Sequence, residues 1–171
     1  MTVFDLVAQV YSDDATVNEM AGVKYLCIEK GLDGAILYDG HHPDDGDDIF
    51  SKYINNEGYS VFSAFIAGDT LTVKVKKAEG GDSDSLTRIF ERSYAESILD
   101  GLPEITYADG RSDDDLWDFK LIDEIVDDYE ISHGVPVDDK DIMEESCRYI
   151  LIKEGIADDV VTSYDIRRRT A

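Results

Sequence analysis

The chain has 171 residues, of which 43% are hydrophobic and 10% are aromatic. That length fits one domain or two small ones, and the apolar content is sufficient for a core, which excludes a wholly disordered protein. The 39 acidic residues outnumber the 16 basic residues and give a formal net charge of −23. This charge excludes direct binding to naked DNA or RNA, because such binding requires a basic surface, and it disfavours anionic membranes.

The sequence also indicates a compartment. The N-terminus has no basic segment followed by an apolar run, so we expect no secretory signal. The longest nearly apolar stretch, Val61–Gly68, is much shorter than the roughly 18–20 residues that span a membrane. Cys27 and Cys147 lie in apolar patterns, which favour buried thiols in a reducing compartment. We expect a cytoplasmic protein, located in the host cytoplasm if a phage encodes it.

The N-terminal third predicts a helix, a strand and a second short helix. Thr16-Val-Asn-Glu19 has the form of a capping box, which predicts a helix from there to a C-terminal stop at Gly31. The apolar residues 35–38 predict a buried strand, and the Gly-, Pro- and Asp-rich segment 39–48 predicts a loop. A short helix is expected over 47–55.

The clearest β signal is segment 59–77, in which Gly68-Asp69 separates two β-rich runs and predicts a hairpin. In the second run, Leu71, Val73 and Val75 alternate with polar residues, as in a half-buried strand. The segment 78–85 has no apolar periodicity and predicts a linker.

Beyond this linker the chain predicts helices only. Apolar residues at helical spacing extend from Leu86 to Gly101. A second helix is expected from a cap at 112–115 to Tyr129, and a third over 138–155. A short final helix is expected around 160–164.

Together these elements predict an α+β fold. A small antiparallel sheet, built around the hairpin at about 59–77, belongs to the N-terminal half, and the C-terminal half is helical. We expect an N-terminal α/β part over 1–79 and an acidic helical part over 85–171, with a single compact domain as the alternative.

No motif in the sequence specifies a reaction. A phosphate-binding glycine loop, a nucleophile elbow and paired cysteines at zinc spacing are all lacking. His41 and His42 beside the carboxylates of 44–48 are a candidate metal cluster, and the competing interpretation is a solvated acidic turn. We expect no metal, no cofactor and no catalytic residue, and hence a protein that is not an enzyme.

The acidic residues are concentrated in the second half of the chain. Residues 1–80 include 14 acidic and 6 basic residues, whereas residues 81–171 include 25 and 10. The densest segment, 113–130, contains Lys120 as its single base. As a helix this segment would carry about one carboxylate per 3 Å, close to the roughly 3.4 Å between phosphates along one DNA strand.

Helix stability does not account for this pattern. Asp127, Asp128 and Glu130 near the expected C-terminal end oppose the helix dipole. Asp123 repels Asp127 four residues later. We therefore expect the carboxylates to replace nucleic-acid phosphates in contacts with lysines and arginines of a partner. The candidate partner-binding residues are Asp113, Asp114, Asp115, Asp118, Asp123, Glu124, Asp127, Asp128, Glu130, Asp138, Asp139 and Asp141.

Three interpretations of this acidity remain open. In the first, the protein mimics nucleic acid and inhibits a DNA- or RNA-binding protein by stoichiometric binding to its basic groove. Phage antagonists of restriction or CRISPR systems are similar in size and composition. In the second, it is an immunity protein that neutralises a basic toxin. In the third, it is a salt-adapted soluble protein with an unrelated function.

We expect the first interpretation. The partner would be a basic nucleic-acid-binding protein or complex, with no direct contact to nucleic acid or membrane. A homodimer is left open.

Overall fold

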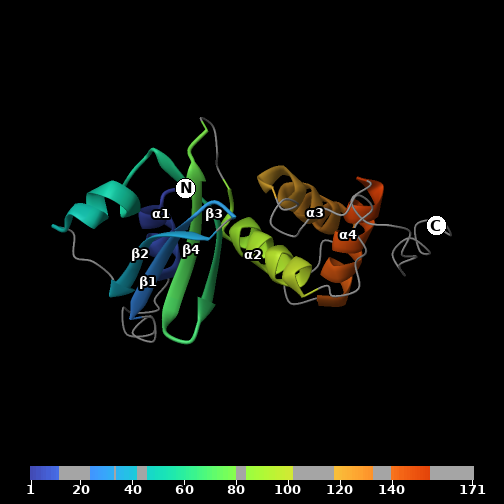
Figure 1. Cartoon of the computed structure of the whole chain (residues 1–171), viewed down its shortest axis with the longest axis horizontal. Coiled ribbons are helices and arrows are strands. Elements are labelled where there is room, and N and C mark those ends of the chain that lie inside the picture. Colours follow the sequence, from blue (N-terminus) through green and yellow to red (C-terminus); the bar gives the residue numbers. More distant parts are fainter. Residues whose placement is uncertain are drawn as a thin grey trace. The chain divides into compact units, whose positions relative to one another are not determined.

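The computed structural model describes residues 1–11, 24–32, 34–41, 46–79, 84–101, 118–132 and 140–154. The chain divides into two compact units, Met1–Phe90 and Glu91–Ala171, which we call unit 1 and unit 2. The elements follow in the order α1 (Val3–Tyr11), β1 (Tyr25–Lys30), β2 (Ala35–His41), a π-helical turn η2 (Phe50–Ile54), β3 (Tyr59–Ala67), β4 (Thr70–Lys77), α2 (Leu86–Asp100), α3 (Phe119–Ser132) and α4 (Lys140–Lys153) (Figure 1).

Unit 1 contains a four-stranded mixed sheet in the order β2-β1-β4-β3. β3 and β4 form the predicted antiparallel hairpin, and Gly68 has the positive φ, 61°, that its tight turn requires. β1 is antiparallel to β2 but parallel to β4. The predicted α+β fold is confirmed, and the central parallel pair is an addition to the antiparallel sheet that the hairpin pattern predicted.

One face of the sheet supplies the core of unit 1. Alternate side chains of β1 and β4 point to this face, among them Leu26, Ile28 and Val73, and all of these are buried. They pack against apolar side chains of α1 and η2, such as Leu6 and Ile54. Figure 1 shows α1 on one side of the sheet. The core therefore joins the first residues of the chain to its central hairpin.

The start of α1 is fixed by a reciprocal capping box that the sequence analysis did not identify. The backbone N–H of Asp5 donates to Thr2 Oγ1 at 3.1 Å, and the N–H of Thr2 donates to Asp5 Oδ2 at 3.0 Å. The carbonyl of Met1 accepts from the N–H of Val61 in β3 at 2.7 Å. These bonds satisfy backbone groups that a helix start leaves unpaired, and they fasten the N-terminus to the sheet.

The predicted helix that ends at Gly31 is wrong over its last residues, because β1 occupies 25–30. β1 has neighbours on both sides, and Leu26, Cys27 and Ile28 are all buried, so period-two alternation is absent. Gly31 has a φ of 67° and belongs to the turn that follows the strand. The proposed cap at 16–19 lies outside the described residues.

The predicted loop over 39–48 is also corrected in part. Strand β2 continues through Asp39, Gly40 and His41, because these residues pair with the beginning of β1. Residues 42–45 lie outside the described part of the chain. The helix expected over 47–55 is confirmed as a helical turn that ends in η2.

Unit 2 is built from helices, as predicted. α2 has the predicted limits; it begins in unit 1 and continues into unit 2, and Ser85 Oγ accepts from the N–H of Arg88 at 3.2 Å as its N-cap. α3 and α4 pack together through buried apolar side chains, including Ile122, Ile125 and Cys147. The helix expected around 160–164 lies outside the described residues. None of the described helices has the length and apolar character needed to cross a bilayer.

A buried serine in α4 provides a test of this packing. Ser146 is fully buried, and its hydroxyl oxygen has no hydrogen-bond partner among the described residues. A buried hydroxyl in this state costs about 1–3 kcal/mol. We expect Ser146→Ala to raise the free energy of unfolding, measured in urea, by more than the about 0.5 kcal/mol that helix propensity alone contributes. Ser97→Ala on the exposed side of α2 is the matched control, and equal effects of the two substitutions would contradict the burial of Ser146.

Candidate functional site

The described part of the chain includes seven of the twelve candidate partner-binding residues. Those on α3 or at its start are Asp118, Asp123, Glu124, Asp127, Asp128 and Glu130, and Asp141 lies in the first turn of α4. The other candidates, Asp113, Asp114, Asp115, Asp138 and Asp139, lie outside the described residues.

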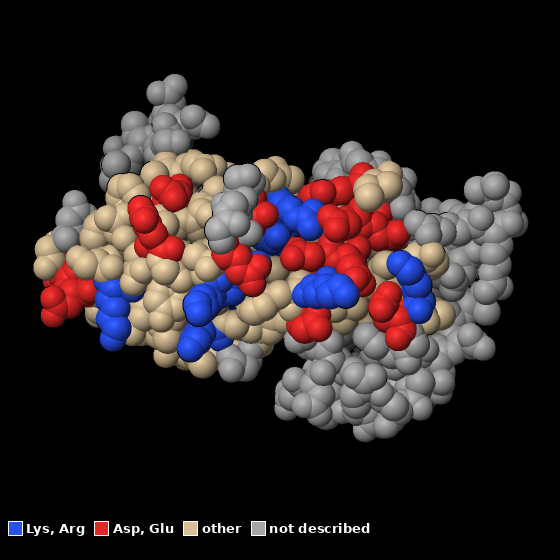
Figure 2. Space-filling model, turned by 90° about the horizontal axis from the view of Figure 1, so that it is seen from above, with Lys and Arg blue, Asp and Glu red and all other residues tan. Residues whose placement is uncertain are grey.

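Many carboxylates of unit 2 lie close together on the face of the protein that is seen in Figure 2. Figure 2 shows them over α2, α3 and α4, with lysine and arginine side chains between and beside them. We call the described carboxylates of these helices, apart from the buried Glu91, the acidic surface: Glu96, Asp100, Asp118, Asp123, Glu124, Asp127, Asp128, Glu130, Asp141, Glu144 and Glu145. Its members differ in exposure, and two of them have defined roles within the unit.

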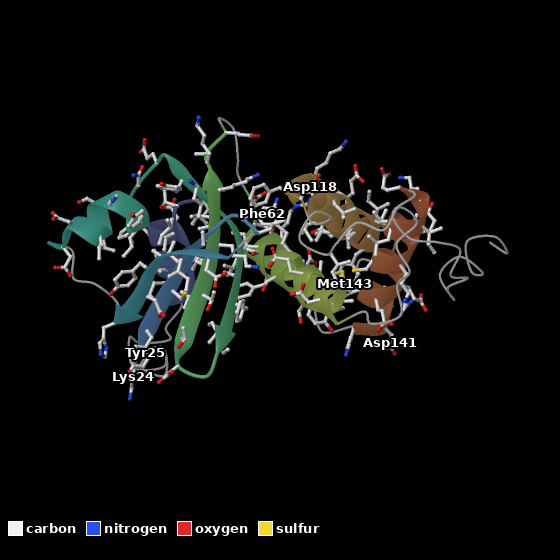
Figure 3. All side chains as sticks on the ribbon, in the orientation of Figure 1. Lys24, Tyr25, Phe62, Asp118, Asp141 and Met143 are labelled. Carbon is white, nitrogen blue, oxygen red and sulfur yellow. The ribbon has the colours of Figure 1, made fainter. Side chains whose placement is uncertain are left out.

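Asp118 is the N-cap of α3. Its Oδ1 accepts from the backbone N–H of Leu121 at 2.6 Å, and its carbonyl accepts from Ile122 at 3.2 Å. The described helix therefore begins at Phe119, later than the cap predicted at 112–115, which lies outside the described residues. Figure 3 labels Asp118 at this end of α3. The carboxylate has a structural reason to be there, because it satisfies an unpaired N–H at the positive end of the helix.

Asp123 points toward α2. Its Oδ1 accepts from Arg92 Nε at 2.8 Å, and the exposed fractions of the two side chains are 30% for Asp123 and 4% for Arg92. A hydrogen-bonded ion pair in this partly buried position is stronger than one in water. Sequence reasoning missed Arg92, because a single arginine within a helical pattern gives no sign that it is buried.

The outward side of α3 is acidic but not uniformly so. Lys120, Glu124, Asp127 and Ile131 recur at intervals of four, three and four residues and therefore share one helix face. Lys120 Nζ lies 3.8 Å from Glu124 Oε1, in a pair whose lysine is 84% exposed, so its contribution is at most about 1 kcal/mol. Ile131 is 86% exposed. The face thus combines carboxylates with one cation and one apolar side chain.

The remaining candidates on α3 and α4 differ in exposure. Asp128 is half-buried, and its Oδ2 is shielded from solvent. Glu130 and Asp141 are exposed. The neighbouring Tyr129 is fully buried. Asp127, Glu130 and Asp141 are exposed, and the half-buried Glu124 shares the outward face with Asp127, so these four carboxylates are the best placed to meet a partner.

The two thiols are buried and free, as predicted. Burial raises the pKa of Cys27, and the nearby Glu29 and Asp39 raise it further. Burial also raises the pKa of Cys147, far above its ordinary value, with a smaller contribution from Glu144. A raised pKa leaves little thiolate at neutral pH, so neither cysteine has the environment of a nucleophile.

The histidine cluster is described only in part. The ring of His41 lies 4.7 Å from that of Tyr25, centroid to centroid, and His41 is exposed at the end of β2. His42, Asp44 and Asp45 lie outside the described residues. Among the residues that the structure describes, no group of three or more ligand-type side chains could hold a metal ion.

Comparison of this chain with protein-family models, with curated proteins and with solved structures finds no match.

Removal of the Asp118 cap should destabilise α3. We expect Asp118→Ala to lower the free energy of unfolding by about 1 kcal/mol, measured by urea unfolding followed by circular dichroism. Asp118→Asn is the control, because an asparagine side chain accepts the same hydrogen bond. Equal losses in the two variants would contradict the capping role.

The thiols should resist alkylation in the folded protein. We expect iodoacetamide at neutral pH to modify neither cysteine rapidly, with Cys147 the slower, and to modify both after unfolding in urea. Because both pKa values are raised, reactivity should increase only as the pH rises well above neutral. Peptide mass spectrometry measures each site separately, and rapid labelling of native Cys147 would contradict its burial.

Proposed function

We propose that this protein is a stoichiometric inhibitor of a DNA- or RNA-binding protein, of the anti-restriction or anti-CRISPR type. The acidic surface of unit 2 occupies the basic groove in which the partner otherwise holds nucleic acid. The observation that supports this proposal is the gathering of carboxylates on α2, α3 and α4 (Figure 2). Glu130 is informative among them, because it lies in the last turn of α3, where a carboxylate opposes the helix dipole.

In this proposal the carboxylates act as substitutes for phosphates. Glu124, Asp127, Glu130 and Asp141 accept hydrogen bonds from lysines and arginines of the partner, and an arginine can engage one carboxylate through two parallel bonds. Complementary potentials accelerate encounter and select strongly basic partners. Inhibition follows from occupation of the groove, so the protein needs neither catalytic residue nor cofactor.

Neutralising this surface should weaken binding. The test variant combines Glu124→Gln, Asp127→Asn and Glu130→Gln on α3. The matched control combines Asp48→Asn, Glu57→Gln and Glu79→Gln, which remove the same charge from exposed positions of unit 1. Binding is measured to a restriction endonuclease and to a CRISPR effector nuclease without its guide RNA. Lysozyme serves as the control protein, because it is basic but its function is not to bind nucleic acid.

We expect the α3 variant to lose about ten- to a hundredfold in affinity for at least one nuclease, because three carboxylates that contact the partner in this proposal lose their charge. The unit 1 control should lose much less. Affinity should fall as salt rises, and duplex DNA should compete for the nuclease. Equal losses in the two variants, or affinity that does not change with salt, would contradict the proposal. Binding to one basic toxin alone would favour the immunity interpretation instead.

A further inference from the structure

We infer that Arg92 is the residue that positions the acidic surface of unit 2, an inference that rests on the function proposed above. Arg92 is a cation with only 4% of its side chain exposed, and its Nε donates to Asp123 Oδ1 on α3 at 2.8 Å. Burial of a guanidinium is costly unless a carboxylate accepts its hydrogen bonds. The burial of Arg92 therefore depends on its partners, and Asp123 ties α3 to α2.

Within the ion pair, Arg92 on α2 is followed along its helix face by acidic residues. Glu96 and Asp100 follow Arg92 at intervals of four residues, so all three share one helix face. Glu96 is half-buried and Asp100 is exposed. Arg88 lies one turn before Arg92 on the same face, so Arg92 lies where this row changes from basic to acidic residues.

Asp123, the other member of the ion pair, is likewise followed by acidic residues along α3. Asp127 and Glu130 follow Asp123 at intervals of four and three residues and share its side of the helix. The ion pair between Arg92 and Asp123 connects the two acidic rows. Without the arginine, the carboxylates of α2 and α3 would repel one another. Arg92 therefore sets α3 against α2 and fixes the spacing between acidic side chains on the two helices.

Fixed spacing matters for the proposed inhibitor. A basic groove that binds nucleic acid presents its cations at positions matched to regularly spaced phosphates. Carboxylates held in a fixed arrangement bind such a groove more tightly than carboxylates on a loosely packed helix, because less order has to be imposed on binding. Arg92 acts here as a positioning residue that the partner does not have to touch.

The test compares Arg92→Met with Lys120→Met. Both substitutions replace one cation by methionine and make the net charge more negative by the same amount, but Lys120 is 84% exposed on the outer face of α3. Amide hydrogen exchange is measured by mass spectrometry. We expect faster exchange in α3 of Arg92→Met, little change in Lys120→Met, and slower exchange again in Arg92→Lys than in Arg92→Met. Unchanged exchange of α3 in Arg92→Met overturns the inference.

The second readout is affinity for the CRISPR effector nuclease without its guide RNA. Net charge alone predicts tighter binding for both methionine variants. Positioning predicts about tenfold weaker binding for Arg92→Met, and no loss for Lys120→Met. Tighter binding of Arg92→Met would overturn the inference. If the unmodified protein does not bind this nuclease, the proposed function fails for that target, and the exchange of α3 decides the role of Arg92 by itself.

Discussion

Repulsion between carboxylates is the constraint that the packing of unit 2 has to satisfy. Several interactions among the described residues offset it, and three of them involve a hydrogen-bond donor within 3.5 Å. Asp118 lies at the positive end of α3, Asp123 meets the buried Arg92, and Arg148 lies 3.3 Å from Glu144 one turn earlier on α4. Each of these three interactions places a negative group beside a hydrogen-bond donor. The apolar contacts between α3 and α4 can therefore form although the helices carry many like charges.

Unit 1 is organised by a different contact, the parallel pairing of β1 with β4. This pairing joins the β1–β2 hairpin to the β3–β4 hairpin and makes one sheet of two local units. It also places Leu26 and Ile28 beside Leu71 and Val73 on the face that α1 and η2 cover. The core of unit 1 consists of apolar residues, so its stability does not depend on the charge pattern that dominates unit 2.

The sequence was informative where structure is local. The hairpin at 59–77 and the limits of α2 could be predicted, because each depends on a pattern of residues close in sequence. These patterns are the alternation of apolar and polar residues, the Gly-Asp turn and the helical spacing of apolar residues. β1 could not, because a strand buried on both faces has no alternation, and its apolar residues also fit a helical spacing. The parallel pairing of β1 with β4 depends on residues more than forty positions apart and leaves no local sign.

The candidate site, too, could be predicted only in those features that depend on residues close in sequence. Composition located the acidic helix, and spacing indicated which carboxylates repel. Neither could indicate that Asp118 is a cap or that Asp123 turns inward, since both roles depend on partners that become neighbours only after folding. The exposure of Ile131 could have been inferred, because it continues the spacing of Glu124 and Asp127 along one helix face.

The buried ion pair also bears on why the protein is acidic at all. A charge that only keeps a protein dissolved works equally well in any arrangement, because solubility depends on net charge and not on the distances between side chains. A solubilising surface would gain nothing from a cation that is nearly inaccessible to water. Arg92 neither adds to the negative charge nor contacts solvent appreciably, yet it orders two helices that carry acidic rows. The proposed inhibitor requires such an arrangement, because it depends on where the carboxylates lie as well as on how many there are.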